Sequence, residues 1–127
     1  MIVNDPTTLG EVTAAFERYE KALMENDVAA LDAMFWVSPL TLRYGVGENL
    51  YGFAAIQEFR KARAGGSPQR TLRNTVITTY GTHFGTASTE FLRASSTRIG
   101  RQSQSWALMP EGWRIVSAHV SMMAEHS

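Results

Sequence analysis

Apolar residues recur at two different spacings along the chain, and the change of spacing after residue 68 divides it into a helical part and a stranded part. A first helix is predicted to begin at a capping box formed by Thr8 and Glu11, in which the Thr8 hydroxyl accepts from the Glu11 amide. Behind this box, the apolar positions form one stripe at helical spacing: Val12, Phe16, Tyr19 and Leu23.

Shorter elements are predicted before the change of spacing. Asp27 is placed to cap a second, short helix. Residues 41–44 predict a strand, and residues 48–51 can return as its hairpin partner after the glycine-rich turn between them. Residues 53–62 show helical spacing and predict a third helix, which is followed by a glycine- and proline-containing loop at 64–68.

The second part of the chain predicts four long strands, at about residues 70–80, 83–93, 98–109 and 113–123. Helices followed by long hairpins are the order of an α+β protein with a mostly antiparallel sheet. Long strands in a small sheet twist strongly, so N-terminal helices packed on the concave side of a strongly curved sheet would form a cone. We therefore expect one domain, residues 1–127, with a pocket at the open mouth of the cone.

Composition excludes several classes of protein. The 127 residues include 44% hydrophobic side chains, which is enough for a core, and twelve basic residues balance twelve acidic ones. Without a basic excess or a Lys/Arg run, a nucleic-acid partner is not expected. The absence of cysteine excludes disulfides and thiolate zinc sites. No signal peptide or membrane span is visible, so a cytoplasmic location is expected, without membrane contact.

Two polar side chains on otherwise apolar elements are the first candidates for chemistry. Tyr19 lies on the stripe of the first helix, where it is either a core tyrosine or a hydroxyl that donates a proton inside the pocket. Arg43 is either an outward charge on an edge strand or a guanidinium fork for a substrate carboxylate. Glu48 could pair with Arg43 across the hairpin and orient that fork.

The strand at residues 98–109 carries further candidates. Gln102, Gln104 and Trp106 share one face, and Trp106 indicates that this face points inward. Buried amides need partners, so the two glutamines predict either a substrate-binding surface or, alternatively, a solvated or dimer-forming face. Three more side chains are candidates for substrate binding: Asn74, Glu90 and His119.

The three histidines, His83, His119 and His126, do not have the spacing of metal ligands. Nucleophile elbows, phosphate loops and dinucleotide fingerprints are also absent from the sequence. We therefore expect no metal and no cofactor, and a chemistry that uses tyrosine, arginine and amide groups, with a carboxylate or histidine as a further candidate.

Several blocks of the sequence resemble the AtzH-like family, which includes the oxalurate-catabolism protein HpxZ. The most specific blocks are Arg-Gln-Ser-Gln at 101–104 and Ala-His-Val-Ser at 118–121, and the resemblance extends over nearly the whole chain. It implies the cystatin-like, SnoaL-like cone of nuclear transport factor two, and a homodimer formed through the outer face of the sheet. The other matching blocks are residues 43–45, 48–52, 59–60, 74–81, 100 and 112–117.

The resemblance also implies an activity. The family is linked to hydrolysis and decarboxylation of a small N-carboxylated urea or ureido acid, in catabolism of ureides, purines or triazine-type compounds. Its functional Tyr and Arg correspond to Tyr19 and Arg43 in this sequence. Two alternatives stay open: a dimeric accessory subunit that binds a small anionic ligand and works with an amidase encoded nearby, and a purely structural dimerisation domain.

Overall fold

The computed structural model of the chain describes residues 1–63 and 65–125. Three helices, α1 (Pro6–Glu25), α2 (Val28–Ala33) and α3 (Phe53–Ala62), lie before the long strands. A short hairpin separates α2 from α3, and the four long strands follow the loop after α3. The strands are β1 (Leu42–Tyr44), β2 (Asn49–Tyr51), β3 (Arg70–Tyr80), β4 (Phe84–Arg93), β5 (Gly100–Met109) and β6 (Gly112–Met122).

The predicted α+β class and the long strands of the second part are confirmed. All strands belong to one sheet with the order β2-β1-β6-β5-β4-β3. The long strands form an antiparallel meander, whereas β1 pairs with β6 in parallel. Helix α3 and strand β3 have the predicted boundaries. Of the predicted loop at 64–68, residues 65–68 lie between them as expected, and Ala64 lies outside the described residues.

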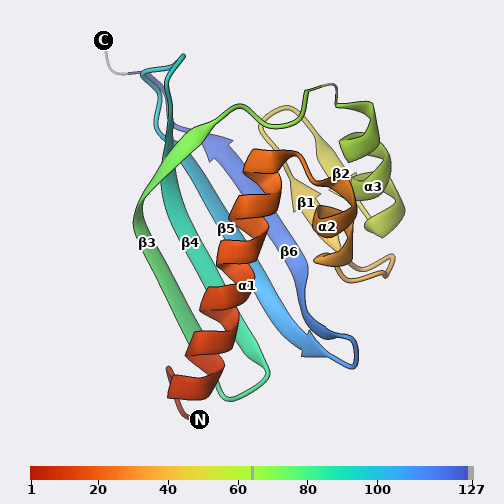
Figure 1. The fold of residues 1–127 in the computed structure, drawn as a ribbon, viewed down its shortest axis with the longest axis vertical. Helices are drawn as coiled ribbons and strands as arrows, with labels where there is room; N and C mark the ends of the chain where they lie inside the picture. The colour runs from red at the N-terminus through yellow and green to blue at the C-terminus, as the bar shows by residue number, and fades with distance from the viewer. Residues whose placement is uncertain (64, 126–127) are drawn as a thin grey trace.

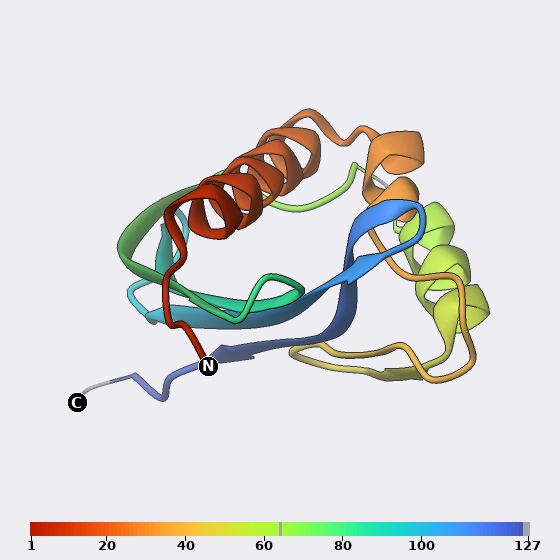
Figure 2. The same ribbon diagram turned by 90° about the horizontal axis from the view of Figure 1, so that it is seen from below.

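One face of the sheet, called the inner face below, is covered by the helices. Helix α1 crosses it diagonally, while α2 and α3 lie beside the short hairpin (Figure 1). The view from below shows the sheet curving beneath α1 and leaving its opposite, outer face free of helices (Figure 2). None of the helices in residues 1–63 and 65–125 is both long and apolar enough to cross a membrane.

The core lies between α1 and the inner face. The predicted stripe of α1 is buried, with Tyr19 only 4% exposed, and it packs in one cluster with sheet residues such as Ala87, Trp106 and Ile115. A long-range hydrogen bond adds to this contact, because the indole of Trp113 donates to the Glu11 carboxylate at 2.8 Å. Burial of one helical face against the sheet therefore fixes α1 in place.

The predicted capping box is wrong. Helix α1 begins at Pro6, and Asp5 is its N-cap, since the Asp5 carboxylate accepts from both the backbone amide and the hydroxyl of Thr8. Proline suits the first helical position because its missing N–H has no partner there in any helix. Glu11, which would have closed the box, is held by Trp113 instead. Asp27, in contrast, caps α2 as predicted.

We expect Asp5→Ala to lower the free energy of unfolding by about 1 kcal/mol, since this is the typical loss for an N-cap. Urea denaturation measures the change. Glu17→Ala is the matched control, because Glu17 is exposed on the same helix, and it should stay within about 0.5 kcal/mol of the wild type. Equal stabilities for the two variants would contradict the assignment of the cap.

Candidate functional site

The inner face of β5 carries polar side chains at positions where a plain core would be apolar. Gln102, Gln104 and Trp106 are 3%, 2% and 0% exposed, as the inward position of Trp106 predicted. In each amide the carbonyl oxygen accepts one hydrogen bond. The Gln102 carbonyl oxygen accepts from Arg70 at 3.0 Å, and the Gln104 carbonyl oxygen accepts from the Trp106 indole at 3.0 Å. The amide nitrogens of both glutamines are buried without a partner among the described residues.

Arg43 also points to the inner face. It is 7% exposed, and its Nη1 donates to the Glu48 carboxylate at 3.0 Å, which is the partner that the sequence suggested. The other Glu48 oxygen accepts from the Gly47 amide at 3.2 Å. Glu48 therefore holds one terminal nitrogen of Arg43. The Arg43 Nε, on the side edge of the guanidinium, is buried and unpaired within the described chain.

Strand register brings Arg43 and Gln104 onto one row. Arg43 pairs with Ala118 of β6, and Ala118 pairs with Gln104 of β5. The Cα atoms of Arg43 and Gln104 are therefore two strands, or about 10 Å, apart. Because only the methyl group of Ala118 lies between them on this row, the two long polar side chains can reach the same small molecule.

Helix α3 adds two guanidinium groups to this region. Arg60 is 5% exposed and lies over the Phe35 ring at 5.7 Å. Arg63 and Arg43 both lie over the Phe59 ring, at 5.4 and 5.6 Å. Contacts between a cation and an aromatic face partly compensate for the water that a buried guanidinium loses.

Tyr19 belongs to the same region. Its ring packs edge-on against Phe35 with 6.2 Å between centroids, on the ring that also contacts Arg60. Burial lowers the pKa of Arg63, and the positive charges of Arg43 and Arg60 lower it further, whereas the Tyr19 side chain acts in the opposite direction. Tyr19 and Arg43, predicted from different elements, are thus within electrostatic reach of one guanidinium.

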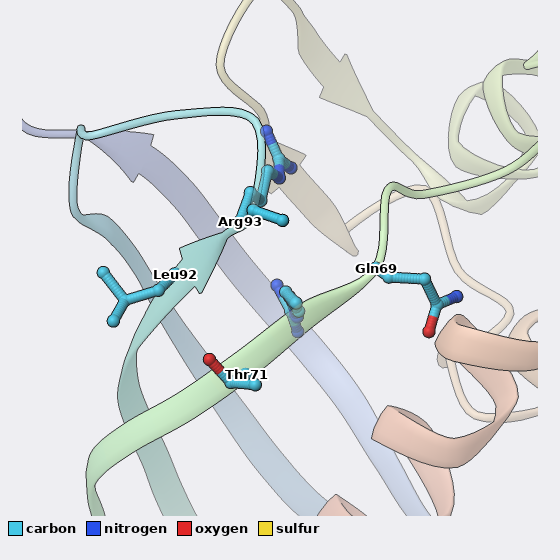
Figure 3. Close-up of a pocket in the computed structure, with 6 residues that line it drawn as sticks. Gln69, Thr71, Leu92 and Arg93 are labelled. Atoms are coloured by element: carbon cyan, nitrogen blue, oxygen red, sulfur yellow. The ribbon is translucent and has the colours of Figure 1, made fainter.

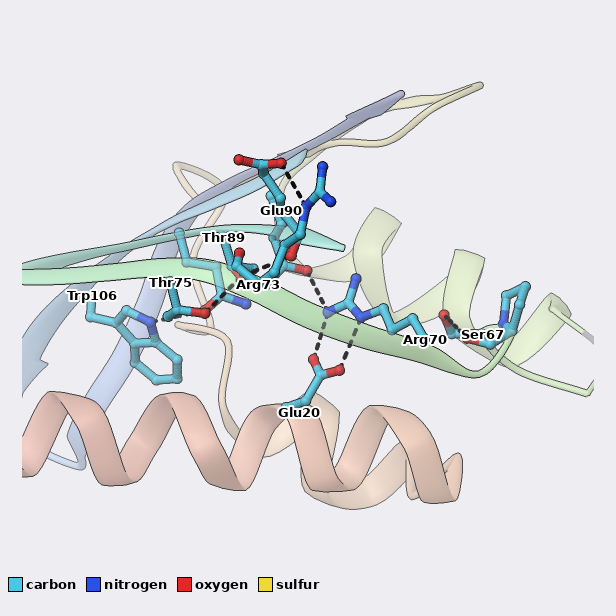
Figure 4. A network of polar contacts seen from close by, with 11 residues as sticks. Glu20, Ser67, Arg70, Arg73, Thr75, Thr89, Glu90 and Trp106 are labelled. Carbon is cyan, nitrogen blue, oxygen red and sulfur yellow. Dashed lines mark hydrogen bonds and ion pairs between the residues drawn. The ribbon is translucent and has the colours of Figure 1, made fainter. Parts of the chain in front are cut away.

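A second group of arginine side chains lies where β3 begins and β4 ends. The Phe91 ring is enclosed by two guanidinium groups, with Arg70 at 4.6 Å and Arg93 at 5.1 Å from its centroid. Arg70 donates through two nitrogens to Glu20 of α1 and also binds Gln102 (Figure 4). Burial lowers the pKa of Arg93, and the nearby charge of Arg70 adds to this effect.

Most of the buried side-chain polar atoms that lack a partner are hydrogen-bond donors. Among the described residues, six are nitrogens, which we call the donor cluster, and two are oxygens. The nitrogens are Nε2 of Gln102 and Gln104 and Nε of Arg43, Arg60, Arg63 and Arg93; the oxygens are Asp32 Oδ1 and Thr79 Oγ1. An unpaired buried donor costs free energy, and its natural partner is an acceptor. Acceptor atoms of a ligand could therefore satisfy the unpaired donors between the inner face and the helices.

A cavity of about 410 Å³ opens at the ends of β3 and β4 (Figure 3). It touches the cluster through Arg70 and Arg93, and its other lining residues are Gln69, Thr71, Leu92 and Ala94. Tyr19, Arg43 and Trp106 do not line this cavity, although the sequence led us to expect all of them around one pocket. Tyr19 and Trp106 belong instead to the buried core, and Arg43 lies on one row with Gln104, which accepts from Trp106.

Three candidates lie on the outer face rather than beside Tyr19 and Arg43. Glu90 and Asn74 are bonded to each other at 2.9 Å, and Glu90 also binds Arg73 at 3.1 Å, on the outer face (Figure 4). The Asn74 and Arg73 contacts hold the pKa of Glu90 below its ordinary value. His119 is exposed on the outer face and packs against the Tyr44 ring. The reason is alternation, because Phe91 and Ala118 occupy the neighbouring inward positions.

A metal centre is not evident in residues 1–63 and 65–125, where no group of three or more His, Cys, Asp or Glu side chains gathers. His126 lies outside these ranges.

The sequence analysis did not identify four arginines of this region: Arg60, Arg63, Arg70 and Arg93. The pattern of α3 could have indicated Arg60, because it shares the buried stripe of this helix with Ile56. The other arginines flank loops, and nothing in their local pattern distinguishes them from surface charges.

The fold and this site define the class of protein. A cystatin-like fold protein from Burkholderia xenovorans is 48% identical over 99% of both chains, with a TM-score of 0.94. A nuclear transport factor 2-like protein from Salmonella enterica is 29% identical over 95% of this chain and 94% of its own, with a TM-score of 0.75. The chain therefore has the cystatin-like, nuclear transport factor 2-like fold.

The chain belongs to the AtzH-like family, whose model matches residues 1–126. A protein of unknown function from Pectobacterium atrosepticum is 61% identical over 96% of this chain and 95% of its own, with a TM-score of 0.94. The comparison with curated proteins gave no match.

We expect Gly45→Ala to break the Arg43–Glu48 pair. A Cβ atom at Gly45 would overlap the Glu48 carboxylate and lie 2.9 Å from Arg43 Nη1, so the variant should lose about 1–3 kcal/mol of stability in chemical denaturation. Gly47→Ala is the control, because nothing lies within 4 Å of its Cβ position. If both variants lose the same stability, steric exclusion at Gly45 is not what preserves the pair.

Proposed function

We propose that the protein binds a small N-carboxylated urea or ureido acid within the cone and cleaves it without a cofactor, by hydrolysis or decarboxylation. The observation that carries this proposal is the set of unpaired buried donors on the inner face. A carboxylate and a urea oxygen are acceptors that such donors bind, and guanidinium groups are the usual partners of carboxylates. Membership of the AtzH-like family supports the same substrate class.

Arg43 is the proposed carboxylate ligand. Glu48 occupies its Nη1, so the Nε edge of the guanidinium is free to receive a ligand. Arg60 and Arg63 add positive charge without a carboxylate partner among the described residues. A small anion at this place would meet three guanidinium groups on aromatic supports.

Tyr19 is the proposed proton donor. In the bond-breaking step, the bond between nitrogen and the carboxylate carbon breaks, its electron pair stays on nitrogen, and that nitrogen takes a proton from the Tyr19 hydroxyl. Carbon dioxide leaves, and solvent returns the proton to Tyr19. Arg63 interacts electrostatically with Tyr19, and a nearby positive charge stabilises an oxyanion that forms in a reaction step.

The donor excess favours decarboxylation over activation of water by a base. Both carboxylates at the edge of the cluster are engaged, Glu20 by Arg70 and Glu48 by Arg43. A general base would need a free acceptor, and the carboxylate oxygen that is buried without a partner among the described residues, Asp32 Oδ1, lies on α2, where Gln57 holds the other oxygen. Decarboxylation needs only an anion-binding group and a proton donor. The same observation also fits a second function, in which the protein is an accessory subunit that binds an anion through these donors without turning it over.

Tyr19→Phe and Arg43→Lys separate these functions. We expect Tyr19→Phe to lower turnover of carboxylated ureas by at least ~10²-fold while ligand affinity stays close to the wild type, since only a proton donor is lost. Arg43→Lys should also weaken binding, because an ammonium group cannot form the planar fork. Kinetics of carbon dioxide release and calorimetric titration measure the two effects. Wild-type turnover by Tyr19→Phe would contradict the catalytic role, and binding without turnover by the wild type would favour the accessory subunit.

We also propose that two copies of the chain pair through the outer face, which carries exposed apolar residues such as Val76, Tyr80 and Phe84. Ser103→Arg should produce a monomer, because Ser103 is exposed in the middle of this face and bonded to Ser88. Light scattering checks the mass, and Thr7→Arg on the exposed surface of α1 is the control. A monomeric wild-type protein at micromolar concentration would contradict the pairing.

A further inference from the structure

The orientation of the two buried amides is fixed by their neighbours. A glutamine side chain can be rotated to exchange its oxygen and nitrogen, and the choice follows from the partners. Arg70 and the Trp106 indole are donors only, so the ends of Gln102 and Gln104 that they contact at 3.0 Å must be the carbonyl oxygens. Each amide therefore turns its NH₂ group away from that partner.

The neighbours that fix the amides are themselves held in place. The Arg70 side chain is 2% exposed, stacks on Phe91, and is bound by both oxygens of Glu20. Phe91 in turn lies against Gly100, where a Cβ atom would overlap its ring. Trp106 is completely buried. Because these supports cannot move freely, the amides cannot easily flip to offer an oxygen.

We propose that Gln102 and Gln104 are oriented donors that select an oxygen atom of the ligand over an amino group, with Arg70 and Trp106 as the residues that set this orientation. The inference rests on the proposed function in one respect, that the inner face binds the ligand. It adds the specificity of the site: the ligand presents a carbonyl or carboxylate oxygen to β5, and an analogue with NH₂ at that position is rejected because donor would face donor.

Two small acids test this selection. Ureidoacetate and guanidinoacetate share a carboxylate and nearly the same shape, but the urea oxygen of the first is an NH₂ group in the second. In calorimetric titration of the full chain, we expect ureidoacetate to bind at least about tenfold more tightly, the equivalent of one hydrogen bond to a charged or strongly polarised site. The positive charge of guanidinoacetate also disfavours it, so the preference is measured in the variants below and in a control on the outer face as well.

Gln102→Glu and Gln104→Glu are the matched variants. Each keeps the size of the side chain and an oxygen for Arg70 or Trp106, and replaces only the NH₂ group by an acceptor. Each should reduce the preference for ureidoacetate by about tenfold. Arg70→Met should also reduce the preference for ureidoacetate. In the Arg70→Met protein, adding Gln102→Glu should have little further effect, because Arg70 no longer holds the Gln102 amide. Arg73→Gln, on the outer face of the same strand, should leave the preference unchanged.

A measurement without ligand decides the inference independently. If the amide nitrogens face the guanidinium cluster unpaired, Gln104→Glu places a carboxylate there and should raise the thermal midpoint of the free protein. A lower midpoint, or an unchanged preference in both glutamate variants, overturns the inference. If the wild type binds neither acid, the proposed function fails for this ligand class, while a raised midpoint still supports the orientation of the amides.

Discussion

Burial of positive charge inside the cone is the constraint on which the rest of the site depends. An isolated buried guanidinium is costly, and each one here has a specific compensation. Arg43 and Arg70 are paired with Glu48 and Glu20. Arg60, Arg63 and Arg93 rely on aromatic faces among the described residues, at 5.1 to 5.7 Å from ring centroids. Burial lowers the pKa of Arg63, and the neighbouring charges of Arg43 and Arg60 lower it further.

Small residues in the sheet and in the turn between β1 and β2 allow this arrangement. Gly45, in that turn, leaves space for the Arg43–Glu48 pair, and Gly100 of β5 leaves space for the Phe91 ring on which Arg70 and Arg93 stack. Ala118 provides only a methyl group between Arg43 and Gln104. A glycine in a strand normally weakens it, so the presence of Gly100 opposite a buried aromatic ring indicates that the ring determines the position. The sheet is therefore shaped around its polar interior as well as its apolar core.

The sequence predicted the positions of the helices and strands better than it predicted which side chains lie on the inner or outer face of the sheet. Turn residues and changes of spacing located the helices and strands, and Trp106 identified the inner face of β5. The faces of Glu90 and His119 stayed undetermined, because alternation defines two faces without saying which is buried; the inward residues are their neighbours Phe91 and Ala118. Asn74 lies at an irregularity of the β3–β4 register, with a positive φ of 53°, which no pattern of apolar residues reveals. Pairings between distant elements, such as Glu20 with Arg70, depend on tertiary packing alone.

The excess of donors also links stability to binding. Unpaired buried donors lower the stability of the free protein, and such local departures from good packing are characteristic of functional sites. An anion that binds only the folded chain both satisfies these donors and shifts the unfolding equilibrium in proportion to its concentration. Glu48 already holds Nη1 of Arg43, and Glu20 holds Nε and Nη2 of Arg70, so these carboxylates orient the two guanidinium groups. The positive charge that they leave is what the proposed anion would neutralise.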